Sequence, residues 1–197
     1  MNHLLSLASL NNRYFVMRHG HSLANQQGLI VSAPENGVPA YGLSSLGRQQ
    51  VEDSIDNAAG FAGDLRILSS DFCRARETAQ RVANRFGVEI ETDHRLRERF
   101  FGELELGPDS AYPEVWREDE RDADHRYRQV ESPASVMARV TALIVEIDAQ
   151  YSGRDFLLVS HGDALQILLT AFAKRDVTTH RSLRHLETAE IRPLVLG

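Results

Sequence analysis

The chain has 197 residues, of which 42% are hydrophobic and 25% are charged. This length suits one domain, and the composition is that of an ordinary globular protein. With 22 Lys and Arg against 28 Asp and Glu, the net charge of −6 disfavours non-specific binding to nucleic acid or to an anionic membrane, so we expect neither as a partner.

Cysteine usage and the N-terminus indicate the compartment. Cys73 is the one cysteine of the chain, which excludes an internal disulfide. Residues 1–5 lack the basic start of a signal peptide, and no apolar run approaches the length of a membrane helix. These features predict a cytoplasmic protein. Cys73 stands beside Arg74 at an expected helix start, where a thiol can become acidic, but a small buried side chain is the simpler interpretation.

Strand and helix signals alternate along the first half. We expect residues 1–12 to form a loose leader, and the apolar run within 13–18 predicts a first strand. Glycine and proline predict a loop over 26–43. The next predicted elements are a helix from about Ser45 to Ala59, a strand from Arg66 to Ser69, a helix over 72–86 that ends at Gly87, and a short strand from Val88 to Thr92.

The second half continues the alternation after an irregular stretch. Residues 107–132 are rich in charge, with a short helix expected near 112–122. Pro133 suits the first turn of a helix that runs to about Tyr151. A strand over 155–160, a helix over 163–173 and a weaker strand near 187–192 follow. This alternation predicts an α/β fold in which helices cover both faces of a mostly parallel sheet.

Basic residues follow three of the predicted strands. Arg18 and His19 come directly after the first strand, and His161 directly after a later one. Arg74 falls in the first turn of the helix after a third strand, with Asp71 as the candidate N-cap. Because ligands bind at the carboxyl ends of strands in open α/β sheets, these side chains are expected to converge on one dianion. Arginine offers paired donors to phosphate oxygens, and a neutral imidazole can attack phosphorus.

The order of the motifs resembles that of the histidine phosphatase superfamily, also called the phosphoglycerate mutase-like family. The similarity covers nearly the whole chain. It is carried by Arg18-His19-Gly20 with Ser22 and Asn25, by Leu43-Ser44-Ser45-Leu46-Gly47-Arg48-Gln49-Gln50, by Ser69-Ser70-Asp71 with Arg74-Ala75 and Thr78-Ala79, by Leu96-Arg97-Glu98 with Phe101-Gly102, and by Ser160-His161-Gly162.

The resemblance implies a single three-layer α/β/α domain over residues 1–197, with a substrate-lid insertion over about 99–132. It implies a phosphomonoesterase without cofactor or metal, which releases phosphate from a small phosphorylated metabolite through a phosphohistidine on His19. The imidazole must be neutral to attack. Arg18, Arg74 and a protonated His161 would hold the phosphoryl oxygens in the transition state.

Protonation of the leaving group is assigned to Glu98 by the same resemblance. A carboxylic acid beside a dianion tends to keep its proton, whereas the alternative is a surface glutamate among arginines. Glu103 and Asp163 are the fallback acids, and Asp163 either faces the pocket or caps a helix. The further expected binding residues are Gly20, Ser22, Asn25, Gly162 and Asp163.

The charged stretch 117–128 has two interpretations. It is either a solvated face of mixed charge or a lid in which one or two basic residues reach the substrate. The candidates are Arg117, Arg121, His125 and Arg126. Likewise, the nearby aromatic residues either line a partly apolar pocket or pack the lid against the core, and these are Phe100, Phe101, Tyr112 and Trp116.

Other functions stay open. A metallohydrolase would use the spacing of His19 and His21 with His161, but Leu23 breaks the extended motif and the adjacent arginines oppose a cation. Family mutases carry a longer insertion with a lysine and adjacent arginines, whereas 99–132 holds no lysine and no adjacent arginine pair. A phosphatase is therefore favoured over a cofactor-dependent phosphoglycerate mutase, a phosphohistidine or phosphoprotein phosphatase and a non-catalytic phospho-binding protein. The sequence predicts neither the substrate nor the oligomeric state.

Overall fold

The computed structural model describes residues 1–57, 60–61 and 64–197. Its strands are β1 (Arg13–Arg18), β2 (Leu65–Ser69), β3 (Ile90–Thr92), β4 (Asp155–Ser160) and β5 (Ile191–Leu194). Together the described residues build one five-stranded sheet in the order β3-β2-β4-β1-β5. The pairs β1–β4, β2–β4 and β2–β3 are parallel, and β5 runs antiparallel to β1 at one edge.

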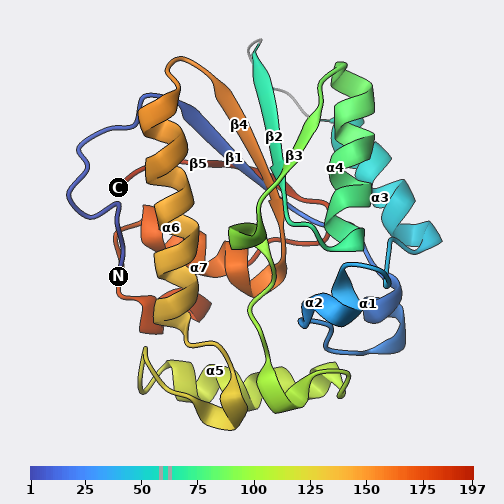
Figure 1. Ribbon diagram of the computed structural model, residues 1–197, viewed down its shortest axis with the longest axis vertical. Coiled ribbons are helices and arrows are strands. Elements are labelled where there is room, and N and C mark those ends of the chain that lie inside the picture. The colour runs from blue at the N-terminus through green and yellow to red at the C-terminus, as the bar shows by residue number, and fades with distance from the viewer. Residues whose placement is uncertain (58–59, 62–63) are drawn as a thin grey trace.

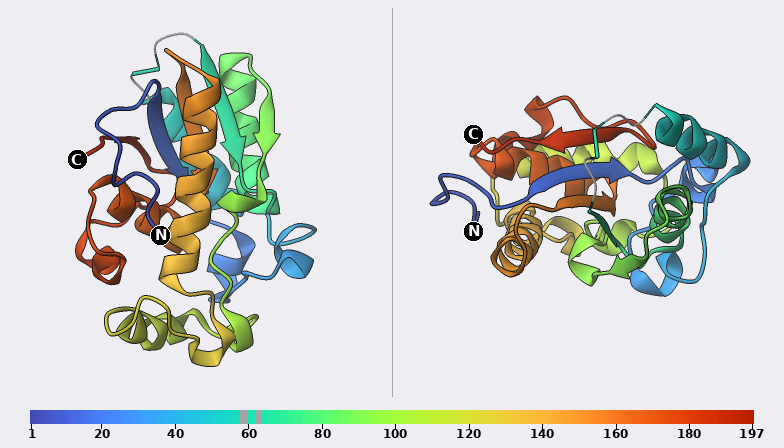
Figure 2. Two further views of the ribbon diagram at one scale, coloured as in Figure 1. Left: turned by 60° about the vertical axis from the view of Figure 1, so that its left-hand side comes forward. Right: turned by 90° about the horizontal axis from the view of Figure 1, so that it is seen from above.

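Helices cover both faces of this sheet. They are α1 (Leu23–Gln27), α2 (Pro34–Gly37), α3 (Ser45–Asp56), α4 (Cys73–Phe86), α5 (Tyr112–Asp119), α6 (Pro133–Gln150) and α7 (Gly162–Phe172), with 3-10 turns at η1 (His94–Leu96), η2 (Gly102–Leu104), η3 (Asp109–Ala111), η4 (Tyr127–Gln129) and η5 (Val177–Ser182). In Figure 1, α6 and α7 lie on one side of the sheet and α3 and α4 on the other, and Figure 2 shows the layers from above. The predicted three-layer α/β/α architecture is confirmed.

Two apolar cores hold the layers together. Alternate residues of a strand point to opposite faces, so β1 contributes Tyr14 and Val16 to the core under α6 and α7. Its Phe15 and Met17 join the core under α3 and α4 instead. Because both faces are covered, the middle of β1 (14–17) and of β4 (156–159) is apolar, and β4 is buried along its whole length. Within the described residues, no helix has both the length and the hydropathy needed to cross a membrane.

Most predicted elements match the structure, with shifts at their ends. The loop expected over 26–43 contains the end of α1 and all of α2. The helix expected to reach Ala59 ends at Asp56, and residues 58–59 lie outside the described residues. The last strand lies further along the chain than the predicted 187–192.

The predicted N-cap of α4 was wrong. Phe72 occupies the cap position and has no side-chain cap hydrogen bond. Asp71 instead accepts from Arg97 Nε and Nη2 at 2.8 and 2.6 Å. A bidentate pair with a guanidinium is stronger than a single cap hydrogen bond, and it lowers the pKa of Asp71. A contact so distant in sequence leaves no local signal.

The N-terminal segment is not the loose leader that we expected. Leu4 is fully buried in the core under α6 and α7. Asn2 Nδ2 donates to the carbonyl of Ala171 at 2.9 Å, and His3 Nδ1 lies 2.8 Å from Thr141 Oγ1. The segment therefore packs along both helices of this layer.

We expect Leu4→Ala to lower the free energy of unfolding by about 2–4 kcal/mol, because it leaves a cavity in a packed core. Leu5→Ala is the matched control, since Leu5 is 57% exposed, and it should change stability by less than about 0.5 kcal/mol. Urea unfolding of the two variants measures the difference. Equal, small effects would mean that the segment contributes nothing to stability.

Candidate active site

The loop after β1 is held against the start of α3. A side-chain Cβ on Gly20 would stand only 2.6 Å from the carbonyl oxygen of Gly47, so this close approach requires glycine. Ser44 caps α3 by accepting from the amide of Gly47 at 3.1 Å. Gln50 Oε1 accepts from the amide of His21 at 2.9 Å. The Leu43–Gln50 motif therefore fixes the backbone on which His19 stands.

His19 is buried with one ring nitrogen ready to react. Its Nδ1 lies 2.8 Å from the carbonyl oxygen of Gly20, a contact that requires the proton on Nδ1. Nε2 is then the unprotonated nitrogen, and it accepts from Arg74 Nε at 3.1 Å. Burial and the positive charges of Arg74 and Arg18 hold the pKa of His19 well below its usual value of 6.5. A neutral nucleophile, as expected from the sequence, is the form that this environment favours.

His161 lies beside His19 with ring centroids 5.1 Å apart. Its Nε2 is 2.8 Å from Ser70 Oγ, and that hydroxyl accepts from the amide of Phe72 at 3.3 Å. Burial and the neighbouring Arg74 hold the pKa of His161 well below its usual value. Burial beside Arg74 therefore favours the neutral form of His161, and the protonated form expected for the transition state stays a prediction. If Ser70 donates to Nε2, a neutral His161 carries its proton on Nδ1.

The cationic side chains around His19 use only some of their hydrogen-bond donors. Arg18 Nη1 donates to the carbonyl of Leu186 at 2.9 Å, and Arg74 Nη2 donates to that of Val31 at 2.8 Å. Within the part of the chain that the structure describes, three buried nitrogens of this group lack a hydrogen-bond partner, namely Arg18 Nε, Arg74 Nη1 and His161 Nδ1. Buried unpaired donors are destabilising, so their concentration at one place indicates a site built for an oxyanion.

A cavity of about 330 Å³ opens beside these groups. It is lined by eight of the predicted residues, namely Arg18, His19, Ser22, Asn25, Arg74, Glu98, Gly162 and Asp163. Two predicted residues are absent from its described lining. The amide of Gly20 donates to Thr78 Oγ1 at 3.1 Å instead, and His161 is wholly buried beside His19. The fallback acid Glu103 is exposed and accepts from Gln129 Nε2, so it is excluded from the site.

Ser22 and Asn25 take part in a local turn as well as in the cavity wall. Ser22 is the N-cap of α1, and its hydroxyl and amide both donate to Asn25 Oδ1, at 2.9 and 3.0 Å. This capping box engages the oxygen of Asn25 and leaves its amide nitrogen as the group available to a ligand.

Glu98 lines the same cavity as Arg18 and Arg74. Its Oε1 accepts from the backbone amides of Arg99 and Ala164 at 2.9 and 3.2 Å. Loss of solvent around the carboxyl and the negative charge of Asp163 raise the pKa of Glu98 above its usual 4.5. A carboxyl group with a raised pKa beside an anion site is suited to donate a proton.

The lid insertion is tied to the body by a buried arginine. Arg99 is completely buried and donates to both oxygens of Asp119 at 2.7 and 2.6 Å, and to Asp163 Oδ2 at 3.4 Å. His125 Nε2 lies 2.6 Å from Asp119 Oδ1. The sequence analysis did not anticipate this role of Arg99, because nothing local distinguishes a buried arginine from a solvated one.

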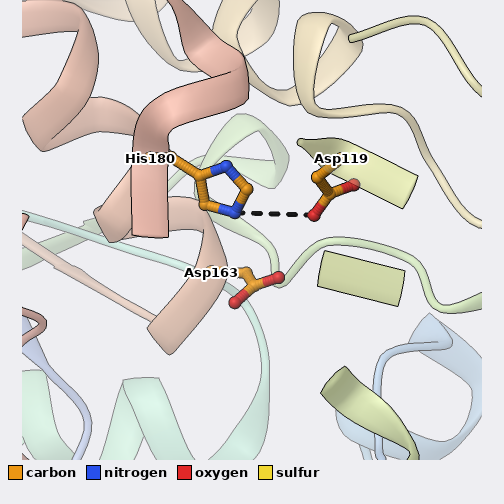
Figure 3. Close-up of side chains that lie close together, drawn as sticks. All are labelled: Asp119, Asp163 and His180. Atoms are coloured by element: carbon orange, nitrogen blue, oxygen red, sulfur yellow. Dashed lines mark ion pairs between the residues drawn. The ribbon is translucent and has the colours of Figure 1, made fainter. Parts of the chain in front are cut away.

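A candidate cation cluster lies in the same network. Figure 3 shows Asp119 and His180, whose Oδ2 and Nε2 are 3.5 Å apart, with Asp163 close by. Single ligand atoms of the three residues lie within 4.8 Å of one another. However, the Arg99 guanidinium already supplies the positive charge between the two carboxylates. We therefore interpret the cluster as an ion-pair network rather than as a metal centre.

The outer wall of the cavity brings in residues that the sequence analysis missed. Arg181, His185 and Leu186 line it from the segment after α7. The Arg181 guanidinium stacks 3.8 Å over the Trp116 ring, and its Nη1 lies 3.3 Å from Asp163 Oδ1. From the lid, the described lining includes Phe101, Tyr112 and Trp116 but neither Phe100 nor any of the four basic candidates Arg117, Arg121, His125 and Arg126. Three of the four aromatic candidates therefore line the cavity, of which Phe101 and Tyr112 also pack in the core of the lid, whereas the four basic candidates are absent from the described lining.

The chain is similar to known proteins in sequence and in structure. The sequence model of the histidine phosphatase superfamily (branch 1) matches residues 14–196. A curated relative named "Probable phosphoglycerate mutase GpmB" from Yersinia enterocolitica is 31% identical over 177 residues, which cover 86% of this chain and 79% of the relative. The resemblance inferred from the motifs is thereby confirmed.

Solved structures give the same fold. A mycobacterial glucosyl-3-phosphoglycerate phosphatase in complex with VO3 superposes with a TM-score of 0.77 at 27% identity, covering 92% of this chain and 91% of that one. The α-ribazole phosphatase from Shigella flexneri superposes with a TM-score of 0.71 at 21% identity, covering 92% and 89%, which is a likeness of fold alone.

The buried neutral histidines predict a pH-dependent stability. The folded pKa values of His19 and His161 lie below the usual 6.5, so the unfolded chain binds protons that the folded chain does not. Stability from this source is complete above about pH 6.5 and is lost as pH falls, by about 1 kcal/mol per pH unit for each histidine.

We expect His161→Gln to flatten this dependence between pH 5 and 7, because it removes one of the two titrations. Urea unfolding of wild type and variant at several pH values measures it, and the other buried histidine of the network, His180, is common to both proteins. The same slope in both would show that His161 is not buried as a neutral group.

Proposed function

Because this chain belongs to the histidine phosphatase superfamily (branch 1), we propose that it is a phosphomonoesterase that works through a phosphohistidine on His19. The observation that carries the proposal is the set of unpartnered buried donors around a neutral His19. Its substrate would be a small phosphorylated metabolite, because the cavity of about 330 Å³ leaves room for a phosphoryl group and a compact leaving group. We propose that the reaction needs no metal ion.

In the first step, the His19 Nε2 lone pair attacks phosphorus while the bond from phosphorus to the leaving oxygen breaks. The hydrogen bond that His19 Nδ1–H donates to the carbonyl oxygen of Gly20 keeps the correct tautomer in place. Arg74, which touches Nε2 at 3.1 Å, is positioned to follow the phosphoryl group as it transfers. Arg18 and Arg74 would oppose the charge on the equatorial oxygens of a loose transition state.

Glu98 would give its proton to the leaving oxygen in that step. Once deprotonated, the same carboxylate would accept a proton from the water that attacks phosphohistidine, so that His19 and inorganic phosphate are released. The two backbone amides at Oε1 hold the carboxyl in place in both forms. One residue thus serves as acid and then as base, and no further proton carrier is needed.

Phosphatase activity is preferred over mutase activity. A mutase must keep the phosphoenzyme from water while a bisphosphate turns around. The lid residues that line this cavity are aromatic, and the Arg181 guanidinium lies over one of them, Trp116. The mutase alternative is retained because a relative of 31% identity carries that name.

We expect purified protein to hydrolyse p-nitrophenyl phosphate in the presence of EDTA, and we expect His19→Ala to reduce turnover by at least about 10⁴-fold, because covalent catalysis is lost. His21→Ala is the matched control, since His21 is outside the described lining of the cavity. Activity that survives in His19→Ala would end the phosphohistidine proposal. Activity that EDTA abolishes would favour a metallohydrolase.

We expect Glu98→Gln to slow β-glycerol phosphate far more than p-nitrophenyl phosphate. An alkoxide leaving group needs a proton, whereas p-nitrophenolate leaves without one, so the difference in kcat/KM should reach about 10²-fold or more. Steady-state kinetics on both substrates provide the comparison. Equal losses on both would move the acid role away from Glu98.

A further inference from the structure

Two carboxylates share one wall of the cavity, and they are bound in different ways. Glu98 and Asp163 both line it. The amide of Ala164, the residue after Asp163, donates to Glu98 Oε1 at 3.2 Å, which places the first turn of α7 directly against the Glu98 carboxyl. Two acidic groups at such a position do not both ionise readily, so their surroundings decide which one keeps a proton.

Asp163 accepts hydrogen bonds from three side chains, two of which are cationic. Its Oδ2 accepts from Trp116 Nε1 at 3.1 Å and from Arg99 Nη1 at 3.4 Å. Its Oδ1 accepts from Arg181 Nη1 at 3.3 Å. Two of the three donors are guanidinium groups, which never act as acceptors for a carboxylic acid proton. Asp163 is therefore held in ion pairs with two arginines, Arg99 and Arg181.

Glu98 has no such charged donor. Its two hydrogen bonds come from backbone amides, and both go to Oε1. Along the described ranges of the chain, no hydrogen bond reaches Oε2, so this oxygen is available to carry a proton. The charged and titratable groups around Glu98 are Arg18 and His19 after β1, Arg74 on α4, the Arg99 guanidinium, Tyr112 on α5, Arg139 on α6, His161 and Asp163 at the start of α7, and Arg181 and His185 after α7.

We propose that Asp163 is a positioning residue that keeps Glu98 protonated and thereby sets the upper pH limit of leaving-group protonation. Arg181 moderates this action because it neutralises part of the Asp163 charge. The inference rests on the proposed function, in which Glu98 is the acid. It assigns Asp163 a role other than the fallback acid, since a carboxylate bound by two guanidinium groups has no proton to give.

The contacts of Asp163 also connect this carboxylate to the lid. Trp116 on α5 donates to Asp163 and lies under the Arg181 guanidinium, while Arg99 links Asp163 to Asp119 at the end of α5. The Asp163 carboxylate is therefore held partly by lid residues and partly by Arg181 from the segment after α7.

The test uses two variants that should shift one pH profile in opposite directions. For β-glycerol phosphate, the alkaline limb of kcat/KM reports loss of the Glu98 proton. Asp163→Asn removes a negative charge, so this limb should move to lower pH by about one unit. Arg181→Met removes a positive charge, so the limb should move to higher pH. Arg121→Gln is the control, because Arg121 is an exposed lid arginine that pairs with Glu118, and its limb should not move.

Opposite shifts support the proposal, since a merely structural role would lower activity at every pH without moving the limb. An unmoved limb in both variants, or shifts in the same direction, would overturn it. If Asp163→Asn does not fold, the position of the alkaline limb in Arg181→Met tests the proposal alone.

Failure of this inference can be told apart from failure of the proposed function. Hydrolysis of p-nitrophenyl phosphate needs no acid. For this substrate, the alkaline limb of kcat/KM should therefore lie at the same pH in all three variants as in wild type. Wild type that does not hydrolyse this substrate would contradict the proposed function itself. Wild type that does so, with variants whose profiles on β-glycerol phosphate do not shift, would contradict only the role of Asp163.

Discussion

Burial of positive charge without a counter-ion is the constraint on which this site depends. Parallel pairing aligns Arg18 with Ser160 at the ends of neighbouring strands, so the residues that follow, His19 and His161, lie side by side. Arg74 completes the group from the start of α4. The surrounding protein leaves donors of these side chains unpaired, which is unfavourable for the fold and favourable for a bound dianion. An acidic chain thus carries a strongly basic pocket.

The acidic residues near the pocket are kept from neutralising it. The pKa of Glu98 is raised, and Asp163 and Asp119 are bound by arginines of their own. Asp163 and Asp119 therefore pair with arginines other than Arg18 and Arg74, which remain available to a phosphoryl group. The lid network performs this separation, which explains why a fully buried Arg99 is placed between body and lid. The ion pairs that attach the lid to the body therefore also keep these carboxylates from pairing with Arg18 and Arg74.

The sequence predicted the layered fold and the strand ends that bear the basic residues, because apolar periodicity and turn glycines are local signals. It did not predict contacts formed across the chain. Asp71 was expected to cap a helix but pairs with Arg97, the N-terminal segment packs through Leu4, and Arg181 reaches the cavity from beyond α7. The depth at which His161 is buried beside Arg74, which lowers its pKa, also depends on packing that no motif encodes.

The central claim is that His19 Nε2 takes the phosphoryl group. Rapid quenching of the protein during turnover of p-nitrophenyl phosphate, followed by mass spectrometry under alkaline conditions that preserve phosphohistidine, tests it most directly. The account predicts one added phosphoryl group per chain, located on the peptide that contains His19 and absent from His19→Ala. Turnover without any phosphorylated chain, or with the phosphoryl group on another residue, would contradict it.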